Sequence, residues 1–116
     1  MVLLALASLW HWTQREDCTE QNLSIGHWQV SRVYSLLGQG ENALRHAERS
    51  LADAEGLAPI YVAYAHEAMA RAALAMGEGT SSREHLAKAV ALAESVTDPE
   101  EKKLLAADLQ ALRARA

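Results

Sequence analysis

Histidines are the side chains of this 116-residue chain that could most directly do chemistry. An imidazole can bind a transition metal or transfer a proton near neutral pH. The two nearest histidines, His11 and His27, are 16 positions apart (27 − 11), so no pair has the spacing of an HExxH metal motif. Any histidine site must therefore be assembled by tertiary contact. The five are His11, His27, His46, His66 and His85.

His27 and His66 are the candidates for such a site, and Glu67 and Cys18 are conceivable further ligands. One hypothesis is therefore a small metal-dependent hydrolase, or another small-molecule-binding helical protein, that uses these two histidines. The alternative is that each imidazole only hydrogen-bonds a loop carbonyl, and we expect no resident metal or cofactor. His46 and His85 have charged neighbours, "RHAER" and "EHLAK", which predicts that they are exposed.

Other catalytic motifs are missing from the sequence, which makes an enzyme the less favoured interpretation. No nucleophile elbow, phosphate loop or dinucleotide glycine motif is present. The 11 basic residues are scattered among 15 acidic ones, which argues against nucleic-acid binding. Cys18 is the single cysteine, so no internal disulfide can form and a reducing, cytoplasmic location is expected. The apolar opening "MVLLALASLW" is too short for a membrane span.

Alanine, leucine, glutamate and arginine dominate the composition, and β-branched residues are few, which predicts an all-α fold. The pattern of apolar residues and breaks predicts about six helices in one domain. Two antiparallel hairpins, about 20–56 and 59–96, are expected between flanking helices at about 2–14 and 99–114.

Local signals predict where these helices begin and end. Thr19 can cap the second helix, and Asp98, followed by Pro99 and Glu101, can cap the sixth. Ser81 and Glu84 have capping-box spacing and predict the start of the fifth helix. The motifs "GQG" and "GEG" are expected to close the helices before them, Gly38 and Gly40 in the first case.

The two predicted hairpins are copies of one another. A shift of 39 positions (66 − 27) aligns His27 with His66 and Arg32 with Arg71 without a gap. The same shift aligns four further pairs: Gly38 with Gly77, Gly40 with Gly79, His46 with His85, and Glu55 with Glu94. A repeated hairpin predicts a short stacked array.

The stretch "VYSLLGQGENALRHAERSLA" resembles a tetratricopeptide repeat, with Tyr34, Gly38, Ala43 and Ala47 at the family's large, turn and packing positions. "AALAMGEGTSSREHLAKAVALA" resembles it less closely, because Ala73 replaces the tyrosine, so the repeats are degenerate. A generic array of helical hairpins is the alternative. The resemblance implies a short superhelix whose concave groove binds a peptide or a segment of a partner protein.

Helical spacing places Trp28, Arg32 and Ser35 on one face of the second helix, and Glu67 and Arg71 on the equivalent face of the fourth. Arginines there could grip a carboxylate of the bound segment. The competing interpretations are a packed Trp28 and a simple Glu67 to Arg71 ion pair. With Tyr64, which the resemblance aligns with a groove position, the predicted ligand-binding set is Trp28, Arg32, Ser35, Tyr64, Glu67 and Arg71.

The first helix is apolar almost all round, so we expect it to be buried on several sides. An end helix has neighbours on one side only, which predicts a homodimer through Leu3, Leu6 and Trp10, with Trp12 nearby. A helix upstream of it is the alternative. A purely structural oligomerising domain remains a third hypothesis for the function.

Overall fold

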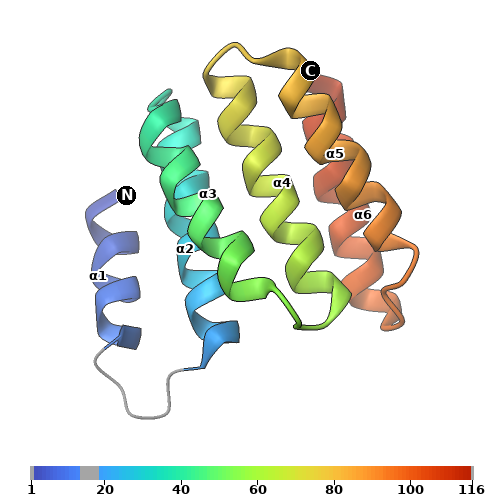
Figure 1. The fold of residues 1–116 in the computed structure, drawn as a ribbon, viewed down its shortest axis with the longest axis horizontal. Helices are drawn as coiled ribbons and strands as arrows, with labels where there is room; N and C mark the ends of the chain where they lie inside the picture. Colours follow the sequence, from blue (N-terminus) through green and yellow to red (C-terminus); the bar gives the residue numbers. More distant parts are fainter. Residues whose placement is uncertain (1, 14–18, 116) are drawn as a thin grey trace.

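The computed structural model describes residues 2–13 and 19–115, and within these ranges the chain forms six α-helices and no strand (Figure 1). The prediction of an all-α fold is confirmed. Cys18 lies outside the described residues. The helices are α1 (Val2–Thr13), α2 (Glu20–Leu36), α3 (Gly40–Ala54), α4 (Pro59–Ala75), α5 (Gly79–Ala93) and α6 (Pro99–Arg115).

Successive helices are neighbours in space. α2 packs against α3 and α4 packs against α5, which gives two hairpins, and contacts from α3 and α2 to α4 join them. In Figure 1, α2 lies behind α3 and α6 lies behind α5. Among the described helices, α1 contacts α2 alone, and α6 contacts α4 and α5. The first helices of the two hairpins, α2 and α4, therefore lie side by side.

Two of the predicted helix starts are confirmed. The Thr19 hydroxyl accepts the backbone N–H of Asn22 at 3.2 Å, and the Asn22 side chain accepts the N–H of Thr19 at 3.1 Å. At the other end, Asp98 accepts the backbone N–H of Glu101 at 2.9 Å, and Pro99 is the first residue of α6. Both caps satisfy N–H groups that have no partner inside the helix.

The predicted start of α5 at Ser81 is wrong. The helix begins at Gly79, and its N-cap Glu78 lies three residues before Ser81 (81 − 78) and makes no side-chain capping hydrogen bond. Gly77, which has a φ of +76°, makes the turn between the hairpin's helices and allows the chain to resume a helix at once. The tertiary geometry of the hairpin sets this boundary, not a local cap.

Each hairpin turn uses only one of its two glycines as a helix stop. Gly38 has a φ of +75°, equivalent to that of Gly77 in the second hairpin, a conformation that other residues rarely adopt. The prediction that Gly40 also closes α2 is wrong, because Gly40 is the first residue of α3 and is buried. A Cβ there would overlap the Met76 side chain and lie 3.2 Å from the Met76 backbone nitrogen. Gly40 is therefore a point of close approach between α3 and α4.

The main core lies between α4, α5 and α6. Alanines from α4 and α5 allow close helix packing, and Leu105, Leu109 and Leu112 of α6 point inward as predicted. The buried members are Ala63, Ala70, Leu86, Ala89, Val96, Leu105, Leu109 and Leu112.

α1 does not bury its apolar surface within the chain. Leu9 packs where Gly26 leaves room, but Leu3, Leu4 and Trp10 are 79%, 76% and 63% exposed. Leu6 is half-buried. Among the described helices only α2 covers α1, as expected for an end helix with neighbours on one side, so a single copy of the chain leaves the rest of its apolar surface uncovered.

Candidate functional site

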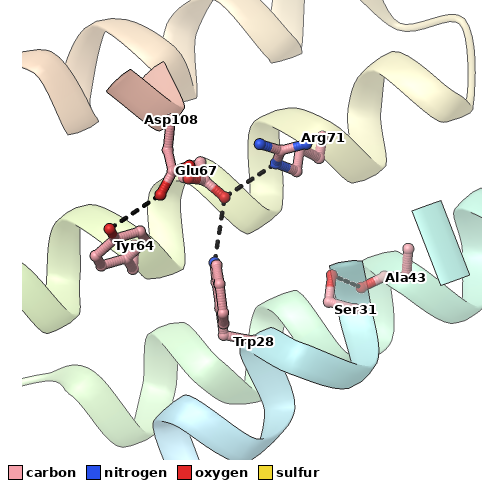
Figure 2. A network of polar contacts seen from close by, with 7 residues as sticks. All are labelled: Trp28, Ser31, Ala43, Tyr64, Glu67, Arg71 and Asp108. Carbon is pink, nitrogen blue, oxygen red and sulfur yellow. Dashed lines mark hydrogen bonds and ion pairs between the residues drawn. The ribbon is translucent and has the colours of Figure 1, made fainter. Parts of the chain in front are cut away.

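Trp28 and Glu67, which are equivalent positions in the two hairpins (67 − 28 = 39), contact one another because α2 and α4 lie side by side (Figure 2). The Trp28 indole N–H donates to Oε1 of Glu67 at 3.2 Å. Nε of Arg71 donates to the same oxygen at 3.0 Å and forms an ion pair with it. Three of the predicted residues therefore form one network.

This network is buried. Glu67 is 0% exposed and Arg71 is 7% exposed, so Arg71 does not present its guanidinium to an open groove as the sequence suggested. Burial raises the pKa of Glu67, while the charge and hydrogen bond of Arg71 oppose that shift. The second carboxylate oxygen of Glu67 has no hydrogen-bond partner among the described residues. The Trp28 hydrogen bond to Glu67 therefore links α2 to α4, and the ion pair with Arg71, which lies within α4, provides the buried carboxylate with a charge partner.

Tyr64 joins the network to α6. Its hydroxyl donates to Oδ2 of Asp108 at 3.0 Å, and its ring meets Trp28 edge to face with 5.2 Å between centroids (Figure 2). Burial, followed by the hydrogen bond to Asp108, raises the pKa of the Tyr64 phenol, so it remains protonated near neutral pH. Asp108 and Glu67 thus fix the orientation of the two aromatic rings.

Arg32 and Ser35 extend along α2 beyond Trp28. The Arg32 guanidinium carbon lies 5.5 Å from the centroid of a Trp28 ring, in a cation–π arrangement. Arg32 is only half-buried, which leaves it more accessible than Arg71. The Ser35 hydroxyl is buried without a hydrogen-bond partner among the described residues. Of the two predicted arginines, only Arg32 can reach a ligand.

A pocket of about 340 Å³ opens beside Trp28 and Tyr64. α2, α3, α4 and the first turn of α6 supply its walls, which are mostly apolar and aromatic. Glu101 of α6 carries the charge in this lining. The lining residues are Ser24, Ile25, Trp28, Ser50, Ile60, Tyr61, Tyr64 and Glu101.

Sequence reasoning missed part of this pocket. Ile60 and Tyr61 belong to the first turn of α4, which begins at Pro59. Tyr64 follows them by four and three positions, and this spacing could have indicated a shared helix face. Glu101 was noted only as a helix-capping residue. Its position in the pocket depends on how α6 packs, which no local pattern specifies.

The histidines pair within each hairpin. Nδ1 of His27 lies 2.9 Å from Nδ1 of His46, and Nδ1 of His66 lies 3.1 Å from Nδ1 of His85. The expectation that His27 and His66 meet is therefore wrong, because each faces the second helix of its own hairpin. His46 and His85 are half-buried partners, not exposed residues as predicted.

Burial is the first cause that lowers the pKa of all four paired histidines. For His27 it acts with the neighbouring charges of His46 and Arg49 and lowers the pKa to about 4. For His46 the charges of Arg49 and Arg45 add to burial. In the second pair His85 and Lys88 act on His66, and Lys88 acts on His85, where Glu84 opposes the shift. Both pairs are accordingly neutral near pH 7.

Within the described ranges, no cluster of three or more His, Cys, Asp or Glu side chains could hold a metal ion. None of the helices in the described part of the chain is both long enough and apolar enough to cross a membrane.

Comparison of the chain with models of known protein families, with characterised protein sequences and with solved structures finds no significant match. The resemblance to tetratricopeptide repeats thus stays a prediction.

Proposed function

We propose that this protein is an interaction module that binds a segment of a partner protein in the pocket between α2, α4 and the start of α6. The observation that supports this most is the open, mostly apolar pocket whose aromatic walls, Trp28 and Tyr64, are held by the carboxylates of buried Glu67 and half-buried Asp108. An exposed apolar hollow with fixed aromatic walls is typical of binding sites.

Preorganisation is the physical reason that these walls suit binding. The Trp28 indole is tied to Glu67, and the Tyr64 phenol is tied to Asp108, so little side-chain freedom is left to lose. An immobilised side chain otherwise costs about 0.5–1.5 kcal/mol on binding. Rigid aromatic walls therefore favour a buried anchor side chain from the partner.

The charges around the pocket favour an apolar anchor next to a basic residue. Glu101 lies in the lining, whereas Arg71 is engaged with Glu67 inside the protein. A Lys or Arg beside the anchor would pair with Glu101 at the rim. A partner segment with a basic residue therefore replaces the acidic segment that the sequence suggested. The acidic segment required both Arg32 and Arg71 in an open groove, and Arg71 is buried.

Selection from a displayed library of random peptides tests the proposal. We expect peptides with an aromatic or aliphatic anchor and a neighbouring basic residue to bind. Ile25→Glu, which alters the wall, should weaken their binding by about tenfold or more, equivalent to at least about 1.4 kcal/mol. The matched control is Leu37→Glu, which changes an exposed leucine just after α2, outside the lining, and should have no effect.

Two results would count against this function. One is the selection of peptides whose binding is the same with Ile25→Glu as with Leu37→Glu. The other is the selection of acidic peptides that depend on Arg32 and are unaffected by Glu101→Gln.

We propose further that two copies associate through α1. Leu3, Leu4 and Trp10 expose a larger apolar surface there than a helix in water usually keeps. Leu3→Glu with Trp10→Glu should convert a dimer into a monomer in light scattering. A monomeric unmodified protein would disprove the association.

A further inference from the structure

We propose that each hairpin carries a copper(II) site made by its two facing histidines, His27 with His46 and His66 with His85. The two pairs are separate from the pocket, and the proposal does not depend on the proposed function. The interaction is reversible metal coordination, and the ion completes its coordination shell with water.

The separation between the nitrogens matches two neighbouring ligands of a single ion. Nitrogens about 2.0 Å from a metal lie about 2.8 Å apart at a right angle and about 3.3 Å apart at the tetrahedral angle. The observed separations are 2.9 Å for the first pair and 3.1 Å for the second. The nitrogen separations of both pairs therefore already suit chelation of an ion in a square or slightly opened arrangement.

The two histidine pairs have closely similar ring arrangements. The ring centroids are 5.2 Å and 5.3 Å apart, with interplanar angles of 30° and 26°. Tyr34 stacks on the other side of His46 at 5.8 Å and limits the motion of that ring. Its equivalent in the second hairpin is Ala73 (34 + 39), so the second pair lacks this stacking tyrosine.

Coordination requires a change of tautomer and a rotation of the rings, so that both Nδ1 lone pairs turn toward the ion. In the metal-free pair, one ring donates its Nδ1–H to the bare Nδ1 of the other. Copper binding needs both Nδ1 atoms free of hydrogen, so the donating ring moves its proton to its own Nε2. Each imidazole stays neutral, no proton is released, and no electron is transferred.

Copper(II) suits these pairs better than zinc(II). Two imidazoles with water in a square plane form a common copper(II) environment, and copper(II) binds nitrogen ligands most tightly among the divalent first-row metals. Structural zinc normally requires four protein ligands, and the described residues hold no cluster of three or more candidate ligands. The cationic neighbours Arg45, Arg49 and Lys88 weaken binding of any cation at these pairs.

Copper titration of the full chain followed by electron paramagnetic resonance tests the proposal. The protein is first stripped with EDTA and carries Cys18→Ser, because a free thiol reduces copper(II). We expect two copper ions per chain, each with the splitting that two nitrogen ligands produce. His46→Asn and His85→Asn should each remove one ion, and the double variant should remove both. The control His11→Asn, in exposed α1, should keep both.

Any of three results would overturn the proposal. These are the absence of two-nitrogen spectra from the parent protein, unchanged stoichiometry in the double variant, and copper loss with His11→Asn. Circular dichroism checks that each variant is folded. If a variant unfolds, His27→Asn or His66→Asn replaces it, and the spectrum of the parent protein remains decisive.

Discussion

The two hairpins share a backbone plan but differ in the chemistry of their interiors. In the first hairpin, the hydroxyl of Ser24 donates to the backbone oxygen of Ser50 at 2.9 Å. The hydroxyl of Ser50 in turn donates to the backbone oxygen of Ser24 at 2.8 Å. The equivalent residues of the second hairpin (24 + 39 and 50 + 39) are Ala63 and Ala89, both fully buried. The helix crossing thus requires small side chains, whereas the hydrogen bonds are optional.

A second crossing point supports this conclusion. Ser31 of α2 donates to the backbone oxygen of Ala43 at 2.8 Å. The equivalent pair is Ala70 and Ser82, so the serine has moved to the other helix, where its buried hydroxyl has no partner among the described residues. Both arrangements keep one alanine and one serine at the contact. The small size of the contact residues is retained between the two hairpins, whereas the hydrogen bond of the serine hydroxyl is not.

The largest expected difference between the hairpins concerns the equivalent arginines. Arg71→Ala leaves the carboxylate of Glu67 buried without its charge partner and should lower the free energy of unfolding by about 3–5 kcal/mol. Arg32→Ala removes only a contact with Trp28 and should cost about 1 kcal/mol or less. Urea unfolding measures both. Adding Glu67→Gln to Arg71→Ala should recover much of the loss, and equal costs for the two arginines would contradict the proposed role of burial.

The histidine pairs predict acid sensitivity in the metal-free protein. Unfolded histidine takes up a proton near pH 6.5, but folded His27 does so only near pH 4, so stability is present above pH 6.5 and falls as the pH falls toward 4. From pH 7 to pH 5, His27 alone accounts for about 2 kcal/mol, and the other three histidines add to this loss. Urea unfolding in EDTA across this range measures the slope. His27→Gln should flatten it more than His66→Gln, and an unchanged slope in both would contradict the prediction.

The equivalent glycines at the starts of α3 and α5 should respond differently to alanine. Gly40→Ala places a methyl group against Met76 and 3.3 Å from the carbonyl carbon of Ala75, which should cost about 2 kcal/mol. Gly79→Ala meets only the Arg83 side chain at 3.3 Å, which can move away, so it should be neutral or slightly stabilising. Thermal unfolding compares the two variants. A loss of stability with Gly79→Ala as large as that with Gly40→Ala would contradict the proposed contact between α3 and α4.

The smallest effect on the free energy of unfolding is expected when Ser24 and Ser50 are replaced by alanine, the residue at both equivalent positions of the second hairpin. Ser24→Ala should cost about 1 kcal/mol, the usual net value of one hydrogen bond. Ser24→Ala with Ser50→Ala should cost less than twice as much, because the contact between the two hydroxyls, which lie 3.3 Å apart, is lost only once. Chemical denaturation of the three proteins measures these differences. A double variant that fails to fold would contradict the conclusion that small size is the essential property.

Much of the fold could be predicted from the sequence, because composition, spacing and caps act locally. The helix starts at Thr19 and Asp98 are confirmed, as are the inward leucines of α6. The start predicted at Ser81 is wrong, because the geometry of the hairpin turn overrides a local capping pattern. One-sided covering of α1 was expected for an end helix, but periodicity shows which side is apolar and not what covers it.

Less of the candidate site could be predicted. The sequence identified Trp28, Arg32, Tyr64, Glu67 and Arg71 as residues of one region, and the structure brings them close together. It could not show that Arg71 is buried, because an arginine and a glutamate four residues apart on a helix have the same pattern on a surface and in an interior. The partners of the histidines were missed for a related reason. Equivalent positions suggested His27 with His66, whereas packing inside each hairpin selects His46 and His85.

The sequence by itself determined the helical fold, the turns at Gly38 and Gly77, and the duplication of the hairpin, since these depend on propensity and spacing along the chain. Only the tertiary structure decided which side chains meet. It placed Trp28 against Glu67, His27 against His46, and Glu101 in the wall of the pocket. The physical reason is that a helix presents several faces at once, and the packing of its neighbours selects which face becomes the interior.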